Sequence, residues 1–131
     1  MPAVPASHED LLDVPYATLA TLDAAGRPQL SQIAFLAEDG VVRISLNETR
    51  AKTRNLLRNP EANVLILDPQ NPGRYLEIAG EAEVVPDDDL SFVARAGEKY
   101  GQDFRRHDGP GERRYAVTIH PRRVYAADVF G

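Results

Sequence analysis

The sequence predicts a mainly β protein, a small antiparallel barrel with short helices. Six or seven short segments carry the apolar and β-branched patterns typical of strands, and ten prolines and nine glycines separate them. Strands and helices do not alternate regularly, as they would in a doubly wound parallel sheet. The length of 131 residues, with 43% hydrophobic and 27% charged residues, fits one globular domain over residues 1–131.

The first third of the chain predicts one short helix followed by three strands. Ser7 is the expected N-cap of a helix over residues 7–12. The three strands are expected over residues 16–22, 29–36 and 41–47. Asp39-Gly40 is a strong hairpin signal between the last two strands, so we expect the three to form a meander.

The middle of the chain predicts a basic helix over residues 49–58, with Thr49 as its N-cap. Asn59-Pro60 ends the helix, because proline cannot continue a helical hydrogen-bond ladder. At 100° per residue, the buried stripe of this helix is expected to contain Thr53, Leu56 and Leu57.

The second half predicts further strands and one more helix. Strands are expected over residues 63–68, 75–85, 114–119 and 122–128. Gly80 is the expected place for a bend in the long second of these. A helix is expected over residues 87–100, with acidic residues in its first turn and Gly101 after its last.

Composition excludes several classes of function. The net charge of -5 and isoelectric point near 5.1 disfavour a nucleic-acid binder, and the aromatic residues are not interleaved with the cationic helix. The absence of cysteine excludes disulfides, thiol catalysis and Cys-ligated zinc. No apolar run reaches the roughly 18 to 20 residues of a membrane span, and the N-terminus does not resemble a signal peptide. We therefore expect a cytoplasmic protein with neither a nucleic-acid nor a membrane partner.

The predicted basic helix carries the most informative cluster, with cations at Arg50, Lys52, Arg54 and Arg58. With Thr49 as the N-cap, Arg50 and Lys52 fall in the first turn, where the helix dipole disfavours positive charge. An anion such as phosphate bound at this helix start would explain the arrangement. A basic amphipathic helix is also commonly only a solvated face, and the residues alone leave both interpretations open.

No constellation of residues predicts a protein-borne nucleophile. His8, His107 and His120 are scattered, without a serine or carboxylate partner at diagnostic spacing. Asp87-Asp88-Asp89 is interpreted as an acidic helix start, so no metal and no catalytic residue are assigned. A reaction would have to be driven by a bound cofactor.

Three segments carry a family resemblance: GRPQLSQIAF, VVRISLNETRAKTRNLLRNPEANVLIL and YLEIAGEAEVV. Over roughly residues 10–127 the chain resembles the pyridoxamine 5'-phosphate oxidase-like split β-barrel superfamily, most closely its deazaflavin-dependent reductase branch. The most specific piece is the Arg-x-Lys-x-x-Asn pattern at Arg50, Lys52 and Asn55. The resemblance implies a homodimer of split barrels with two cofactor sites at the subunit interface.

The same resemblance implies a role for nine residues of the chain. It places the cofactor phosphate at Arg50, Lys52 and Asn55, the ribityl chain at Ser45 and Asn47, and the ring at Ser31, Gln32 and Ile33. Tyr75 is expected to come from the partner subunit and cover the ring, although it is equally well an ordinary core residue. The proton donor stays open between Ser31, Tyr75 and water.

Two cofactors fit this resemblance, the deazaflavin coenzyme F420 and FMN. F420 carries a polyglutamate tail that outer cations would attract. The candidate cations are Arg54, Arg58, Arg105, Arg106, Arg113 and Arg114. We therefore expect an F420-dependent reductase that passes a hydride to a small electron-poor substrate, with an FMN-dependent flavoprotein or a cofactor carrier without turnover as alternatives. Pyridoxamine phosphate oxidation itself is not expected, because the longer chain and the C-terminal segment of those enzymes are missing.

Overall fold

A computed structural model describes residues 2–131 and contains one antiparallel sheet of seven strands with three short helices. The mainly β prediction is therefore confirmed. In chain order the elements are the 3-10 helix η1 (Ala6–Asp13), β1 (Tyr16–Leu22), β2 (Pro28–Ala34), β3 (Leu36–Glu38), β4 (Val41–Asn47), α1 (Ala51–Arg58), β5 (Glu61–Asp68), β6 (Asn71–Pro86), α2 (Ser91–Tyr100) and β7 (Arg114–Asp128). None of the helices in the described chain has the length and apolar character needed to cross a bilayer.

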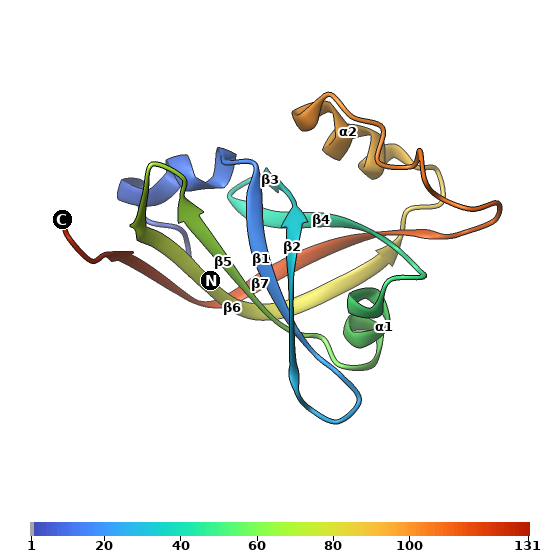
Figure 1. Cartoon of the computed structure of the whole chain (residues 1–131), viewed down its shortest axis with the longest axis horizontal. Helices are drawn as coiled ribbons and strands as arrows, with labels where there is room; N and C mark the ends of the chain where they lie inside the picture. The colour runs from blue at the N-terminus through green and yellow to red at the C-terminus, as the bar shows by residue number, and fades with distance from the viewer. Residues whose placement is uncertain (1) are drawn as a thin grey trace.

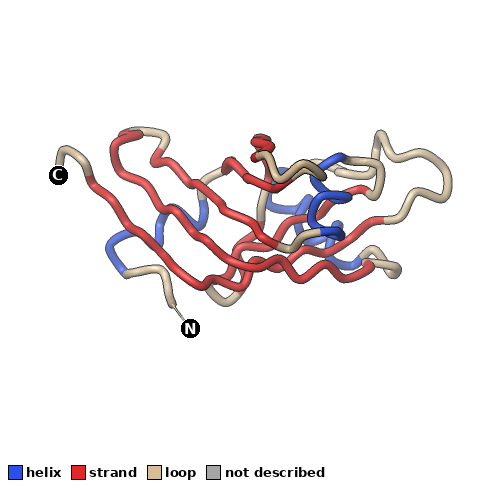
Figure 2. The backbone as a smooth tube through the Cα atoms, turned by 90° about the horizontal axis from the view of Figure 1, so that it is seen from below, coloured by secondary structure: helices blue, strands red, loops and turns tan. Residues whose placement is uncertain are grey.

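The two edge strands of the sheet, β2 and β3, are consecutive in the sequence. The strand order is β2-β1-β5-β6-β7-β4-β3, and only Phe35 separates the end of β2 from the start of β3. The chain therefore passes directly from one edge to the other, and the sheet curls into a half-open barrel (Figure 2). The expected single strand over residues 29–36 is wrong, because it divides at Phe35. The expected meander is also wrong, because β4 pairs with β7 and β3 but not with β2.

The C-terminal end of α2 holds this junction in place. The backbone N–H of Phe35 donates to the hydroxyl of Tyr100 at 2.9 Å, and the Phe35 carbonyl accepts from Lys99 Nζ at 3.0 Å. The Phe35 side chain is buried in the core. The break between the two edges is therefore a fixed corner of the barrel.

Strands β6 and β7 pair along most of their length and run across the full width of the molecule (Figure 1). The register shifts between Ala79 and Gly80, which confirms an irregularity at the expected bend. A Cβ atom at Gly80 would overlap the carbonyl oxygen of His120 on β7, so the close approach requires glycine. The strands expected over residues 114–119 and 122–128 are one strand that continues through this bulge.

Helix η1 closes one end of the barrel with Leu11 and Leu12. Ser7 lies inside this helix, so its prediction as N-cap is wrong: the first turn begins at Pro5, whose carbonyl accepts the His8 N–H at 2.9 Å. The buried ring of His8 donates from Nε2 to the Ala127 carbonyl at 2.9 Å. This bond ties the N-terminal helix to the end of β7.

Helix α1 begins at Ala51, with Arg50 at the N-cap position in an extended conformation. The predicted cap at Thr49 is wrong because the Thr49 hydroxyl donates to Asn47 Oδ1 and does not cap the helix. The buried stripe also differs from the prediction. Leu57 is 54% exposed and Asn55 is buried in its place, because Asn55 hydrogen-bonds to β1 and to the adjoining β2 strand.

Helix α2 begins at Ser91, four residues later than predicted. Leu90 adopts a left-handed backbone conformation and the acidic residues precede the helix, so the expected acidic first turn is wrong. The Asp87 carboxylate nevertheless accepts the N–H groups of Phe92 at 3.1 Å and Val93 at 2.9 Å. The predicted stop at Gly101 is confirmed by its left-handed conformation.

The core fills the barrel between these elements. Its most deeply buried side chains are Leu11, Leu19, Phe35, Val42, Ile44, Val64, Ile66, Leu76, Val117 and Ile119. Burial of each such aliphatic or aromatic side chain contributes about 1.5 to 3 kcal/mol. A second, smaller cluster beneath α2 contains Phe92, Ala96 and Ala116, so α2 covers the outer face of β4 and β7.

Candidate functional site

A cavity of about 390 Å³ lies where the curled edge strand β2 approaches β4 and the start of α1. Its lining residues are Gln32, Ile33, Ala34, Ile44, Ser45, Leu46, Asn47, Arg50, Lys52, Phe104 and Arg114. The lining includes most of the site residues predicted from the sequence; Ser31, Asn55 and Tyr75 are the exceptions. The fold therefore brings together residues that are distant in the chain at the start of the basic helix.

Arg50 and Lys52 face this cavity without a counter-ion. Neither forms an ion pair with any carboxylate of residues 2–131. Desolvation of the half-buried Lys52 ammonium, and then the nearby Arg50 charge, lower the pKa of Lys52 from its usual range. A charge that is desolvated and unpaired has an unmet requirement for an anion.

The backbone at the helix start adds to this requirement. Within the described chain, no acceptor is found for the N–H groups of Ala51 and Lys52, and no side chain caps the helix. Such N–H groups and the positive end of the helix dipole both favour negative charge. Side chains and backbone therefore attract the same kind of ligand at this end of the cavity.

Asn55 does not line the cavity. Its Nδ2 atom donates to Thr21 Oγ1 at 3.1 Å and to Gln29 Oε1 at 2.8 Å, and its Oδ1 atom accepts from Arg58 at 2.9 Å. These bonds dock the buried face of α1 onto β1 and β2. Its predicted contact with a cofactor phosphate is not tested by these bonds and stays a prediction.

Ser45 and Asn47 lie side by side on the cavity wall but differ in their free hydrogen-bonding capacity. Ser45 Oγ has one long contact, at 3.4 Å, with Arg114 Nη1. Asn47 is 5% exposed and is fully engaged by Thr49, Asp108 and Glu112. Ser45 therefore has capacity for a ligand hydroxyl, whereas Asn47 has none in this arrangement.

The predicted ring-binding residues of β2 divide between two faces of the strand. Gln32 is exposed on the outer face, where its Oε1 accepts from the Thr18 hydroxyl at 3.1 Å. Ile33 is buried and forms part of the apolar wall. Ser31 is opposite Leu19 in the register and does not line the cavity.

Tyr75 does not line the cavity. It is opposite Leu67 on β5 and Ala127 on β7, and its ring centroid is 6.3 Å from that of Tyr125. The sequence prediction assigned Tyr75 to the site of a partner subunit. That assignment stays a prediction.

Five lining residues were missed by the sequence prediction of the site: Ala34, Ile44, Leu46, Phe104 and Arg114. Phe104 and Arg114 lie outside the three segments that carry the family resemblance. Arg114 was expected among the free outer cations, which is wrong: it is 9% exposed and pairs with Asp108 at 2.8 Å. Its Nη2 atom also donates to the Phe104 carbonyl at 2.6 Å. No regular spacing links Asp108 to Arg114, so the sequence held no signal for this pair.

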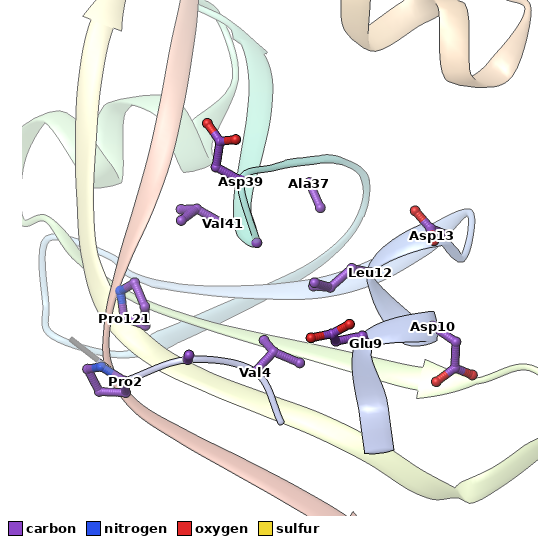
Figure 3. A pocket seen from close by; sticks show the side chains of 12 residues that line it. Pro2, Val4, Glu9, Asp10, Leu12, Asp13, Ala37, Asp39, Val41 and Pro121 are labelled. Atoms are coloured by element: carbon purple, nitrogen blue, oxygen red, sulfur yellow. The ribbon is translucent and has the colours of Figure 1, made fainter. Parts of the chain in front are cut away.

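A larger cavity, of about 600 Å³, lies between η1, the N-terminal segment and the β3–β4 turn (Figure 3). Its charged lining residues are Glu9, Asp10, Asp13 and Asp39, and its lining contains neither arginine nor lysine. This acidic lining would repel a phosphate. The smaller cavity at the α1 start is therefore the better candidate for an anionic ligand.

The titratable groups that line the candidate cavity are Arg50, Lys52 and Arg114. Among the described residues, no histidine or carboxylate lines it: His8 bonds to the Ala127 carbonyl, and His120 pairs with Glu83 on the surface. The cavity can bind an anion and hold an apolar group against Ile33 and Phe104. Its described lining offers neither a histidine nor a carboxylate as a general base.

Comparisons with known proteins agree with this geometry. The family described as pyridoxamine 5'-phosphate oxidase matches residues 4–128. A solved structure described as an F420 reductase is 32% identical, with 93% of this chain and 98% of that chain covered and a TM-score of 0.80.

Two further solved structures share the fold. A Listeria innocua protein provisionally described as a pyridoxamine 5'-phosphate oxidase is 26% identical over 90% of this chain and 96% of its own, with a TM-score of 0.68. A pyridoxamine 5'-phosphate oxidase-related, FMN-binding protein of Nostoc punctiforme has a TM-score of 0.70, over 95% of this chain and 82% of that chain. At 17% identity, the last shows a likeness of fold alone.

Proposed function

Because the chain belongs to the pyridoxamine 5'-phosphate oxidase family, we propose that it is an oxidoreductase that uses coenzyme F420 to reduce a small electron-poor organic substrate. The observation that carries the proposal is the pair of unpaired cations, Arg50 and Lys52, at a helix start that opens onto a cavity. The 32% identity to a protein described as an F420 reductase favours F420 over FMN.

The residues of the cavity fit a cofactor with a phosphate, a ribityl chain and a flat ring. Arg50, Lys52 and the free N–H groups of the helix start would hold the phosphate. Ser45 would donate to or accept from the ribityl hydroxyls, and Ile33 and Phe104 would exclude water from the ring. The bound deazaflavin supplies hydride chemistry, and the protein supplies position and a dry wall.

We include in the proposal a homodimer that closes the cavity. The register of the sheet places Tyr16, Leu30, Leu67 and Tyr125 on one outer face, each between 41% and 68% exposed. Gln32 and Ala34 of the cavity wall share this face with Leu30. A second chain on this apolar face would therefore border the cofactor site. Sedimentation equilibrium distinguishes such a dimer from a single chain.

Titration of the purified protein with F420 and with FMN tests the proposal. We expect tighter binding of F420, followed by reoxidation of the reduced cofactor in a single turnover when an enone or a quinone is added. Arg105 and Arg106 are exposed and form no ion pair with the described residues, so they are free to attract the polyglutamate tail. The affinity for F420 should therefore fall more steeply with salt than that for FMN. Tighter binding of FMN would reverse the choice of cofactor, and the absence of reoxidation would favour a carrier.

The affinity for the cofactor should also depend on alkaline pH through Lys52. Burial lowers the pKa of Lys52 in the free protein, and a bound phosphate would raise it again. Between these two pKa values the complex holds more protons than the free protein, so affinity falls as the pH rises through this window. Binding titrations from about pH 7 to about pH 10 measure the slope.

A Lys52→Arg variant is the matched control for this pH dependence. Arginine keeps its charge throughout the range, so the profile of the variant should be flatter than that of the wild type. An equal slope in both proteins would assign the pH dependence to another group.

A further inference from the structure

Asn47 uses every hydrogen-bonding position of its side-chain amide within the protein. Its Oδ1 atom accepts from both the N–H and the hydroxyl of Thr49, each at 2.8 Å. Its Nδ2 atom donates to Asp108 Oδ1 at 2.9 Å and to Glu112 Oε2 at 2.7 Å. An asparagine amide has two N–H groups and two lone pairs on its oxygen, so this side chain is saturated.

The partners of Asn47 Nδ2 belong to the segment over residues 104–113, which we call the 104–113 loop. Arg114, at the start of β7, fixes this loop because its Nε and Nη2 atoms each donate to the Asp108 carboxylate at 2.8 Å. Glu48 fixes its far end, because the Arg113 N–H donates to Glu48 Oε1 at 2.8 Å and the Glu48 N–H donates to the Arg113 carbonyl at 2.9 Å. The loop is therefore attached to the corner between β4 and α1, at the end of the molecule opposite η1 (Figure 1).

The other side of Asn47 faces the cationic helix start. Its backbone carbonyl accepts the Arg50 N–H at 3.2 Å and the buried Thr53 hydroxyl at 2.7 Å. Its side-chain oxygen fixes Thr49, the residue before Arg50. The turn that presents Arg50 and Lys52 to the cavity is therefore organised around Asn47.

We infer that Asn47 is a positioning residue that couples the 104–113 loop to the Arg50–Lys52 turn, and so sets the preference of the cavity for ligands that carry a phosphate. The inference rests on the proposed function and replaces direct contact between Asn47 and the ribityl chain. A saturated amide has no bond to offer a ligand without breaking one to Thr49, Asp108 or Glu112. Fixing the turn places the two cations before the ligand arrives, which lowers the entropic cost of binding.

The experiment compares ligands with and without the phosphate. FMN and riboflavin differ by the phosphate alone, whereas F420 and its core differ by the phosphate and the tail beyond it. Wild type, Asn47→Ala and His8→Ala are titrated with FMN against riboflavin, and with F420 against its phosphate-free deazariboflavin core. For Asn47→Ala we expect the preference for the phosphate-bearing ligand to fall about tenfold, the effect of losing one well-placed charge-assisted contact. Hydrogen exchange should also quicken in the 104–113 loop of this variant.

His8→Ala is the matched control, because it too removes a buried hydrogen-bonding side chain, but at the opposite end of the molecule. We expect it to lower the melting temperature without changing the phosphate preference or the exchange of the loop. If Asn47→Ala does not fold, Glu112→Ala removes one loop-side acceptor and should reduce the preference about twofold to threefold.

The possible outcomes separate this inference from the proposed function. A wild-type protein that binds neither cofactor overturns both. If the wild type binds, an unchanged phosphate preference in Asn47→Ala, or in Glu112→Ala where that variant is used, overturns the inference alone. Equal losses for the phosphorylated and phosphate-free ligands also overturn it, because they would indicate direct contact with the part that both ligands share.

Discussion

Replacing Lys52 by alanine is expected to weaken binding of FMN or F420 by about 1.5 to 3 kcal/mol, the range for a charge-assisted hydrogen bond. The ammonium of Lys52 is desolvated at the cavity wall and has no ion-pair partner among residues 2–131, so its charge is available to a phosphate. The free energy of unfolding should change little, because the side chain forms no ion pair within the described structure. Isothermal calorimetry and urea denaturation measure the two quantities.

Riboflavin and Arg27→Ala are the controls for this variant. Riboflavin lacks the phosphate, so Lys52→Ala should leave its affinity unchanged. Arg27 is exposed in the turn between β1 and β2 and does not line the cavity, so its replacement removes one positive charge without affecting the site. Equal weakening of FMN and riboflavin by Lys52→Ala would contradict a phosphate-binding role.

The largest loss of stability is expected for Gly80→Val. A Cβ atom at this position overlaps the backbone carbonyl of His120, which cannot move aside as a flexible side chain could. Relief of the overlap requires β6 and β7 to separate at the centre of the sheet, where their register already shifts. We expect the free energy of unfolding to fall by about 3 to 5 kcal/mol, measured by urea denaturation.

Glu81→Val is the matched control for this loss. It introduces the same side chain one position further along β6, where the residue is exposed and the strand favours β-branched residues. Its effect should stay within about 0.5 kcal/mol. A Gly80→Val variant as stable as Glu81→Val would mean that the two strands do not approach as closely at this bulge as the structure indicates.

The burial pattern within a single strand could be predicted from the sequence, but which strands pair with each other could not. In residues 41–47 the apolar side chains of Val42, Ile44 and Leu46 alternate with polar ones, and all three lie in the core. The break at Phe35 has no local signal, because the apolar pattern continues through it and the corner is made by Tyr100 and Lys99 from distant α2. Pairing between strands depends on contacts distant in sequence, which periodicity does not report.

The candidate site was predictable where one short segment carries it. Arg50 and Lys52 lie shortly after β4, and their predicted position against the helix dipole made an anion site one of two interpretations that the residues left open. The family resemblance placed Asn55 with Arg50 and Lys52, but its bonds to Thr21 and Gln29 turn it toward the sheet. The role of Arg114 depends on Asp108 and on the course of the intervening loop, so no local pattern marked it.

The cavity wall combines β2, from the first third of the chain, with Arg114, from the start of the last strand. None of the intermediate stages in which only hairpins have formed would contain both parts of this wall. A ligand that fits the completed cavity would therefore bind the native state but not its precursors. Loading with cofactor would then protect the protein chiefly by slowing its unfolding, and would do little to hasten the folding of a new chain.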